Sequence, residues 1–197
     1  MTKGQDTHAS LVDAAISFAS EEGLAGITIG KLADKVGMSK SGLFAHFSSK
    51  ENLQVEVLKG AIDRFVVMVV SPALKAPRGE PRVTALFERW LAWKDMLPGG
   101  CIFAVASVEL DDKPGPARDL LVASQRDWME TLATAARIAK KEVHFRRDLD
   151  VDQFAHEFYC LGLGQFHVSR LLRDPKSDRR ARSAFDRLIR DARHHAS

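Results

Sequence analysis

The sequence is poor in cysteine and lacks any long apolar run, and each shortage excludes a class of protein. Cys101 and Cys160 are the only cysteines, so a disulfide framework is excluded, and neither belongs to a Cys-x-x-Cys pair. No apolar stretch approaches the length that crosses a membrane, and residues 1–10 lack the apolar core of a signal peptide. We therefore expect a cytoplasmic protein that does not associate with membranes.

Signals for β-strands, internal repeats and low-complexity tracts are also missing. No segment shows sustained apolar–polar alternation flanked by hairpin dipeptides. The 197 residues are 45% hydrophobic and 28% charged, which is typical of a globular protein with one ordinary domain or two small ones. The sequence therefore predicts an all-α fold.

The sequence does contain a succession of amphipathic helices that are separated by glycine and proline. The expected helices cover residues 7–22, 28–36, 40–47, 49–71, 82–96, 101–110, 117–144, 150–173 and 178–194. Residues 72–81 hold three prolines and a glycine, which predicts a loop between two lobes. We expect a three-helix bundle in residues 1–50, a linking helix at about 49–71 and a larger helical lobe in residues 72–197.

Two short helices joined by a tight turn are predicted near the N-terminus. Thr28 and Ser39 are typical N-caps, and Gly37 begins the turn between the helices. Ser48, with Glu51 three residues later, forms a capping-box pattern that opens the linking helix. A helix pair joined by a short turn that contains glycine is the pattern of a helix-turn-helix.

Residues 28–53 read TIGKLADKVGMSKSGLFAHFSSKENL. This segment resembles the DNA-binding domain of TetR-family repressors. In that family a T-x-x-x-[LI]-A-x-x-x-G-[VM]-S pattern precedes a recognition helix ending in aromatic-x-H-F, and S-K-E starts the next helix. The resemblance implies a regulator that binds double-stranded DNA at a palindromic operator. The expected DNA contacts are Thr28, Lys31, Ser39, Lys40, Ser41, Gly42, Phe44, His46 and Lys50.

The physical chemistry of these residues agrees with the resemblance. Leu32, Leu43 and Phe47 would pack the two short helices together and fix the angle at which the second enters the major groove. Lys40 can donate to guanine acceptors or to a phosphate. Lys50 stands at the amino end of the linking helix, where its charge and the free N–H groups can engage a phosphate.

Two positions depart from the family pattern. Gly30 stands where many members carry arginine or serine, and Phe44 stands where many have a tyrosine hydroxyl for a phosphate. We therefore expect phosphate anchoring to depend more heavily on Lys31, Lys40 and Lys50.

For the second lobe the resemblance implies a homodimer and a small apolar ligand, the inducer. Helix 150–173 is apolar on more than one face, so one side can cover its own lobe and the other a partner subunit. The expected dimer contacts are Phe154, Phe158, Leu161, Gly162, Gln165, Phe185, Leu188 and Ile189. The candidate ligand-pocket residues are Phe87, Trp90, Met96, Phe103, Gln125, Trp128 and Met129.

Other features have a simpler interpretation than a second functional site. Cys101 at a helix start could be a redox-sensitive thiol or a small core residue. His156 and Cys160 share a helix face, but two ligands do not make a metal site, and no cofactor is expected. The arginines of residues 178–194 are interleaved with aspartates, which favours a solvated or inter-subunit face over a second nucleic-acid patch.

Two alternative functions stay open at this point. A repressor or architectural DNA-binding protein without an inducer would share the helix-turn-helix but have a solid second lobe. An all-α enzyme would need a nucleophile–base pair, a carboxylate dyad or a metal cluster, and none occurs at a recognisable spacing. The net charge of +3 does not discriminate, because residues 1–50 hold five lysines and five acidic residues and are formally neutral.

Overall fold

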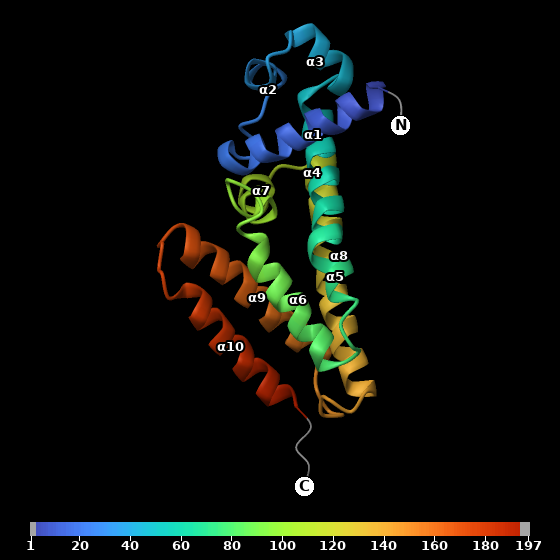
Figure 1. Ribbon diagram of the computed structural model, residues 1–197, viewed down its shortest axis with the longest axis vertical. Coiled ribbons are helices and arrows are strands. Elements are labelled where there is room, and N and C mark those ends of the chain that lie inside the picture. The colour runs from blue at the N-terminus through green and yellow to red at the C-terminus, as the bar shows by residue number, and fades with distance from the viewer. Residues whose placement is uncertain (1–2, 194–197) are drawn as a thin grey trace. The chain divides into compact units, whose positions relative to one another are not determined.

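Figure 1 shows the computed structural model, which describes the backbone of residues 3–193 and the side chains of residues 7–193. Within these residues the regular structure is helical, apart from one isolated backbone bridge between Phe145 and Arg193. This confirms the predicted all-α fold. The elements are α1 (Lys3–Glu22), α2 (Ile29–Val36), α3 (Lys40–Phe47), α4 (Lys50–Phe65), the π-helix η1 (Val66–Val70), α5 (Ser71–Ala73), α6 (Glu80–Trp93), α7 (Ile102–Leu110), α8 (Pro116–Lys141), α9 (Val151–Arg170) and α10 (Ser177–Ala192).

The chain forms two compact units, and neither is continuous in sequence. The first consists of the residues up to Arg64 together with Asp95–Ser124. The second consists of Phe65–Lys94 and the residues from Gln125 onward. The expected boundary at residue 72 assigned all later residues to one lobe. Instead, α7 and the beginning of α8 pack with the N-terminal helices.

The helix pair of the first unit has the caps that the sequence predicts. The hydroxyl of Thr28 accepts from the backbone N–H of Lys31, and the hydroxyl of Ser39 accepts from that of Gly42. Gly37 ends α2 with φ of 69°, a left-handed conformation that glycine adopts without strain. In the same unit α1 crosses α4 (Figure 1), where Gly60 leaves room for side chains of α1.

The cap of α4 differs from the predicted capping box by one residue. Ser48 ends α3 with φ of 59°, and its backbone N–H donates to the carbonyl of Phe44. The N-cap position of α4 is therefore taken by Ser49, whose hydroxyl accepts from the backbone N–H of Asn52 at 3.0 Å. Because both positions hold serine, the sequence pattern alone could not separate the end of α3 from the start of α4.

The linking helix continues beyond the expected end at Pro72. After Phe65 the backbone passes through the π-helix η1 and directly into α5, whose first turn contains Pro72. Proline is tolerated there because the first residues of a helix have no intrahelical N–H bond to lose. The same rule explains why α6 begins before Pro81 rather than after it.

Aromatic rings form the core of the second unit. The rings of Phe87 on α6 and Phe185 on α10 are stacked with centroids 3.9 Å apart, and Phe158 on α9 meets both rings edge-on. Phe154 continues this cluster towards Phe145, in the turn after α8. The core therefore joins α6, α9 and α10.

The remaining helix ends lie within about four residues of the predicted ones, because frayed ends and caps leave such boundaries poorly defined in sequence. Among the described residues, no helix combines the length and the apolar character that crossing a membrane requires.

Candidate nucleic-acid interface

The amino end of α3 presents polar side chains to solvent. Ser39, Lys40 and Ser41 are all exposed, and the hydroxyls of the two serines lie 3.2 Å apart. The helix start also exposes backbone N–H groups, which favour an anion such as a phosphate. This end of α3 therefore presents donors of the kind that base edges and phosphates accept.

The opposite side of α3 is anchored in the first unit. Leu43 and Phe47 are fully buried, as is Leu32 of α2, so the two helices are held at a fixed angle. Phe44 points the other way, with 55% of its surface exposed. Phe47 is therefore a core residue and Phe44 is not.

Lys40 lies beside Gly30 of α2. A Cβ atom at position 30 would stand 3.4 Å from Cε of Lys40, so the glycine leaves a space that the lysine chain occupies. Lys31, the residue after Gly30, is exposed as well. Among residues 7–193, neither lysine forms an ion pair, in contrast to Lys35, which pairs with Glu21 at 3.3 Å.

Two other expected contacts have partners within the protein. Nζ of Lys50 donates to the carbonyl of Ala25 at 2.8 Å, although the side chain stays exposed. The ring of His46 is half-buried and lies 5.7 Å from that of His8 on α1, centroid to centroid. Both residues therefore contribute to packing within the first unit as well as to its surface.

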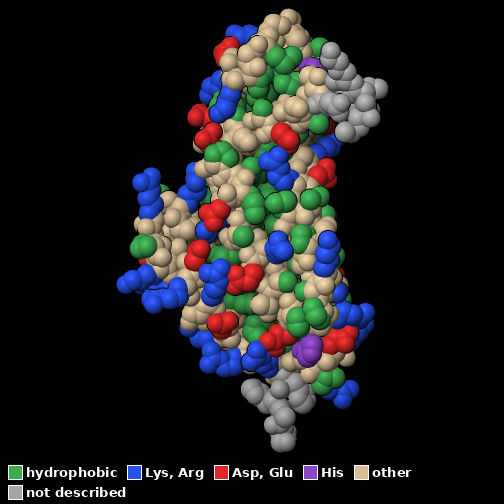
Figure 2. All heavy atoms as spheres, in the orientation of Figure 1, with side chains coloured by type: hydrophobic (Ala, Val, Ile, Leu, Met, Phe, Trp, Pro, Cys, Tyr) green, Lys and Arg blue, Asp and Glu red, His purple; other side chains and the backbone are tan. Residues whose placement is uncertain are grey.

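The basic residues of α10 lie in a different setting. Figure 2 shows Lys and Arg side chains gathered along α10, and two of the arginines of this helix pair with acids. Arg182 makes a bidentate contact with Glu88 of α6, and Arg180 pairs with Asp174. The hydrogen bond to Glu88 raises the pKa of the Arg182 guanidinium above its ordinary value.

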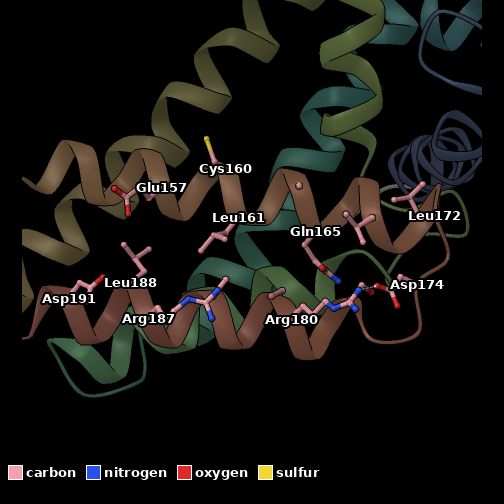
Figure 3. A pocket seen from close by; sticks show the side chains of 15 residues that line it. Glu157, Cys160, Leu161, Gln165, Leu172, Asp174, Arg180, Arg187, Leu188 and Asp191 are labelled. Atoms are coloured by element: carbon pink, nitrogen blue, oxygen red, sulfur yellow. Dashed lines mark hydrogen bonds and ion pairs between the residues drawn. The ribbon is translucent and has the colours of Figure 1, made fainter.

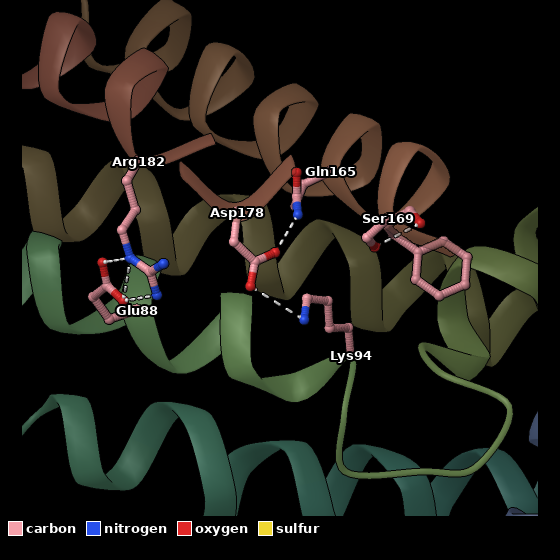
Figure 4. Close-up of polar contacts among 7 residues, drawn as sticks. Glu88, Lys94, Gln165, Ser169, Asp178 and Arg182 are labelled. Carbon is pink, nitrogen blue, oxygen red and sulfur yellow. Dashed lines mark hydrogen bonds and ion pairs between the residues drawn. The ribbon is translucent and has the colours of Figure 1, made fainter. Parts of the chain in front are cut away.

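Three ion pairs connect α10 to α6 along its length. Glu80 pairs with Arg193 at 2.6 Å, Glu88 with Arg182 at 2.9 Å, and Lys94 with Asp178 at 3.4 Å. Asp178 also accepts from the buried amide of Gln165 on α9 (Figure 4). These contacts give Arg182 and Arg193 a structural role that needs no nucleic acid.

The expected dimer residues divide into two groups. Phe154, Phe158, Phe185 and Ile189 are buried within their own unit, and their part in a dimer interface stays a prediction. The space beside Gly162 is also filled from within the chain, because a Cβ atom there would overlap the indole of Trp90.

Leu161, Gln165 and Leu188 line an open groove between α9 and α10, of about 800 Å³ (Figure 3). Leu161 and Leu188 lie along the groove with the charged side chain of Arg187 near its middle, and Asp174 lies beside Arg180 (Figure 3). Glu157 and Asp191 lie at one end, and Arg180 lies towards the other (Figure 3).

The expected pocket residues are divided between the two units. Met96 and Phe103 belong to the first unit, and the other five belong to the second. Met96 is 44% exposed, whereas Phe87 is enclosed in the aromatic core.

Three of the five candidate pocket residues in the second unit lie close together, namely Trp90, Gln125 and Trp128. The ring of Trp90 lies 5.4 Å from that of Trp128 and 5.8 Å from that of Tyr159, whose hydroxyl donates to Gln125. The indole N–H of Trp128 is buried and meets no acceptor among the described residues.

The cysteines and histidines give no metal-binding constellation within the described residues. Sγ of Cys160 lies 3.5 Å from Nε2 of His156 on the same helix face. Cys101 is buried.

Three residues that matter for the first unit gave no signal in the sequence. Glu109 accepts from the backbone N–H of Ala25, Gln54 donates to the carbonyl of Leu24, and Gly99 donates to Ser20. Each contact joins segments that lie far apart in the chain, so local periodicity could not predict it.

Comparison with known proteins agrees with this geometry. Residues 11–57 match the family described as "Bacterial regulatory proteins, tetR family", and residues 79–185 match "Tetracyclin repressor-like, C-terminal domain". The HTH-type transcriptional repressor KstR2 of Mycobacterium tuberculosis is 28% identical over 148 residues, covering 72% of this chain and 70% of the relative.

Solved structures share the fold. A TetR transcriptional regulator from Chloroflexus aurantiacus J-10-FL is 23% identical with a TM-score of 0.86, over 96% of both chains. AibR, solved with isovaleryl coenzyme A and operator DNA, is 18% identical with a TM-score of 0.76, over 94% of this chain and 98% of its own. With the helix-turn-helix geometry and the two family matches together, the chain belongs to the TetR family of DNA-binding transcriptional regulators.

Proposed function

We propose that the protein is a homodimeric repressor that binds a palindromic operator and is released from it by a small apolar ligand. The observation that carries the proposal is the amino end of α3, where Ser39, Lys40 and Ser41 are exposed on a helix whose other side is buried. Such a regulator acts in the cytoplasm of a bacterial cell, where the chromosome lies.

The proposed DNA contacts divide by their position on the helix pair. Ser39, Lys40, Ser41 and Gly42 stand where a recognition helix meets base edges, and Lys40 is the one that can read guanine. The proposed backbone contacts are Thr28 and Lys31 at the start of α2, Phe44 and His46 further along α3, and Lys50 at the start of α4. Phe44 contributes apolar contact only, because it has no hydroxyl to donate.

The groove between α9 and α10 is the proposed dimer interface. Its proposed occupant is a second copy of the chain, because TetR-family regulators act as dimers and the groove leaves Leu161 and Leu188 partly uncovered on α9 and α10. A two-fold axis through the groove would bring α9 and α10 of one protomer against the same helices of its partner. Leu161 and Leu188 would then form the apolar centre of a four-helix interface.

The cluster around Trp90, Gln125 and Trp128 is the proposed ligand site. The buried indole N–H of Trp128 would gain an acceptor from a ligand that carries a carbonyl or ether oxygen. The side chains around it are aromatic or neutral, which suits an uncharged and largely apolar molecule.

The alternative is a repressor without an inducer. The mutual ring contacts of Trp90, Trp128 and Tyr159 favour it, because these side chains already fill space against one another.

Selection of bound fragments from a random DNA pool tests the DNA-binding proposal. We expect a palindrome whose half-sites lie about 34–36 Å apart, which is one turn of DNA. Enrichment of no sequence, or of single half-sites only, would contradict the proposal of a dimer that reads an operator.

Tryptophan emission tests the control of binding by a ligand. An apolar compound that quenches Trp90 and Trp128 should weaken operator binding by roughly 5- to 150-fold, and operator should weaken compound binding by the same factor. Quenching without this reciprocal effect would favour the repressor without an inducer.

A further inference from the structure

The loop between α1 and α2 is held by side chains from two other helices of the first unit. The backbone N–H of Ala25 donates to Oε2 of Glu109, near the end of α7, at 3.0 Å. The carbonyl of Ala25 accepts from Nζ of Lys50 on α4 at 2.8 Å. One residue earlier, the carbonyl of Leu24 accepts from Nε2 of Gln54 on α4, also at 2.8 Å. Two successive peptide groups of the loop are therefore fixed from outside.

The segment that carries α7 also packs closely against the end of α1. Gly23 has φ of 82°, and a Cβ atom there would overlap the carboxylate of Glu109. Ahead of α7, the backbone N–H of Gly99 donates to the buried hydroxyl of Ser20 at 3.0 Å, and a Cβ at Gly99 would overlap the backbone of Ser20. The end of α1 and the loop after it are thus fitted closely to residues 99–109.

The position of this loop determines where the helix-turn-helix lies. Only Gly26 and Ile27 separate Ala25 from Thr28, the cap of α2, and Ile27 is fully buried. In turn, α3 is packed on α2 through Leu32 and Leu43. A displacement of the Ala25 peptide is therefore passed to α2 and to the exposed end of α3.

We infer that Glu109 is a positioning residue for operator recognition, which acts through the Ala25 peptide on the orientation of α2 and α3. The inference rests on the proposed function, in which the amino end of α3 reads DNA. A carboxylate is suited to this role because it accepts a stronger hydrogen bond from a backbone N–H than a neutral group does. Glu109 lies in the segment of the first unit that begins at Asp95. The residue before Asp95 in the chain, Lys94, belongs to the second unit.

Three variants separate positioning from general stability. Glu109→Ala removes the acceptor, and Glu109→Gln keeps an oxygen that can accept from Ala25. Asp112→Ala is the matched control, because Asp112 is exposed, lies three residues away and changes the charge by the same amount. Hydrogen–deuterium exchange without DNA reports on residues 23–47, and titration reports the affinity for selected operator and for random duplex.

We expect Glu109→Ala to speed exchange in the loop and in α2 and α3. It should lower operator affinity by roughly 10- to 100-fold, the effect of one hydrogen bond to a charged group, and leave affinity for random DNA unchanged. Glu109→Gln should restore most of both properties, and Asp112→Ala should match the unaltered protein.

The inference is overturned if loop exchange is unchanged in Glu109→Ala, or if it rises while operator affinity is kept. An equal loss on operator and random DNA would also overturn it, because the residue would then serve only stability. Failure of the proposed function looks different: the unaltered protein would show no operator preference, while exchange would still report whether Glu109 holds the loop.

Discussion

The helix pairs α2–α3 and α9–α10 both expose basic side chains, but in opposite settings. On α2 and α3, Lys31 and Lys40 form no ion pair with any residue between 7 and 193. On α10 and just after it, Arg182 and Arg193 each make bidentate contacts with a glutamate of α6. By the number of cations alone α10 would be the better candidate for binding DNA. For binding DNA, the partners of a cation therefore matter more than the number of cations.

Their apolar faces differ as well. The inward residues of α2 and α3 are fully buried, and the exposed surface of the pair is largely polar apart from Phe44. The pair α9–α10 buries one face in an aromatic core and still leaves an apolar groove open. One pair is complete within the chain, and the other has a face that a second copy would cover.

The largest expected effect tests that open groove. Replacing Leu161 and Leu188 by aspartate should convert the dimer to monomers, because each buried leucine contributes about 1.5–3 kcal/mol and the two-fold axis doubles the loss. Sedimentation velocity at micromolar concentration measures the change. Val143→Asp, at an exposed apolar position outside the groove, is the control. A dimer that survives the double replacement would place the interface elsewhere.

The second effect separates core from interface. Phe185→Ala should lower the free energy of unfolding by about 3–5 kcal/mol, because it removes a ring stacked on Phe87 and leaves a cavity. Leu171→Ala, at a position that is 67% exposed, should change it by less than about 0.5 kcal/mol. Chemical denaturation measures both. A folded Phe185→Ala protein of unchanged stability that fails only to dimerise would show that Phe185 belongs to the interface after all.

A third effect sharpens the view of α3. Lys40→Ala should cost about 1–3 kcal/mol at particular base pairs if Lys40 reads guanine, and so change sequence preference. Lys50→Ala should weaken binding to all sequences and reduce the salt slope by about one unit if Lys50 contacts a phosphate.

Titrations of both variants against a panel of operator variants at several salt concentrations distinguish these roles. An unchanged slope for Lys50→Ala would leave Lys50 with only its bond to Ala25.

The smallest effect concerns the ion pairs of α6 and α10. Arg182→Ala should lower the free energy of unfolding by no more than about 1 kcal/mol, because the pair with Glu88 is partly exposed and screened by water. The loss should shrink as salt is raised. Glu88→Ala should give a similar loss, and the double variant should cost less than the sum of the two single losses. A loss of several kcal/mol would mean that the pair is shielded far better than its exposure indicates.

The sequence could predict the helix-turn-helix because its determinants are local. Thr28, Gly37 and Ser39 act within four residues of their own positions, and the buried stripe of α2 follows helical spacing. Ser48 and Ser49 could not be told apart in this way, since either residue satisfies the N-cap pattern of α4.

Contacts distant in the chain could not be predicted from periodicity. An apolar stripe shows that Phe158 and Phe185 are covered, but it does not show whether their own chain or a partner covers them. The placement of α7 with the N-terminal helices depends on Gly99 and Glu109, which carry no local signature. The candidate pocket residues fall in both units because bulky side chains were chosen by size and not by neighbourhood.

One measurement compares the two regions directly: operator affinity against salt for two double variants of equal charge change. We predict that Lys31→Ala with Lys40→Ala will lower operator affinity and reduce the salt slope by about one unit for each phosphate that a lysine no longer neutralises. Arg179→Ala with Arg190→Ala, on the exposed side of α10, should bind as the unaltered protein does. If the α10 variant bound operator more weakly and the α2–α3 variant did not, the assignment of DNA recognition to α3 would be contradicted.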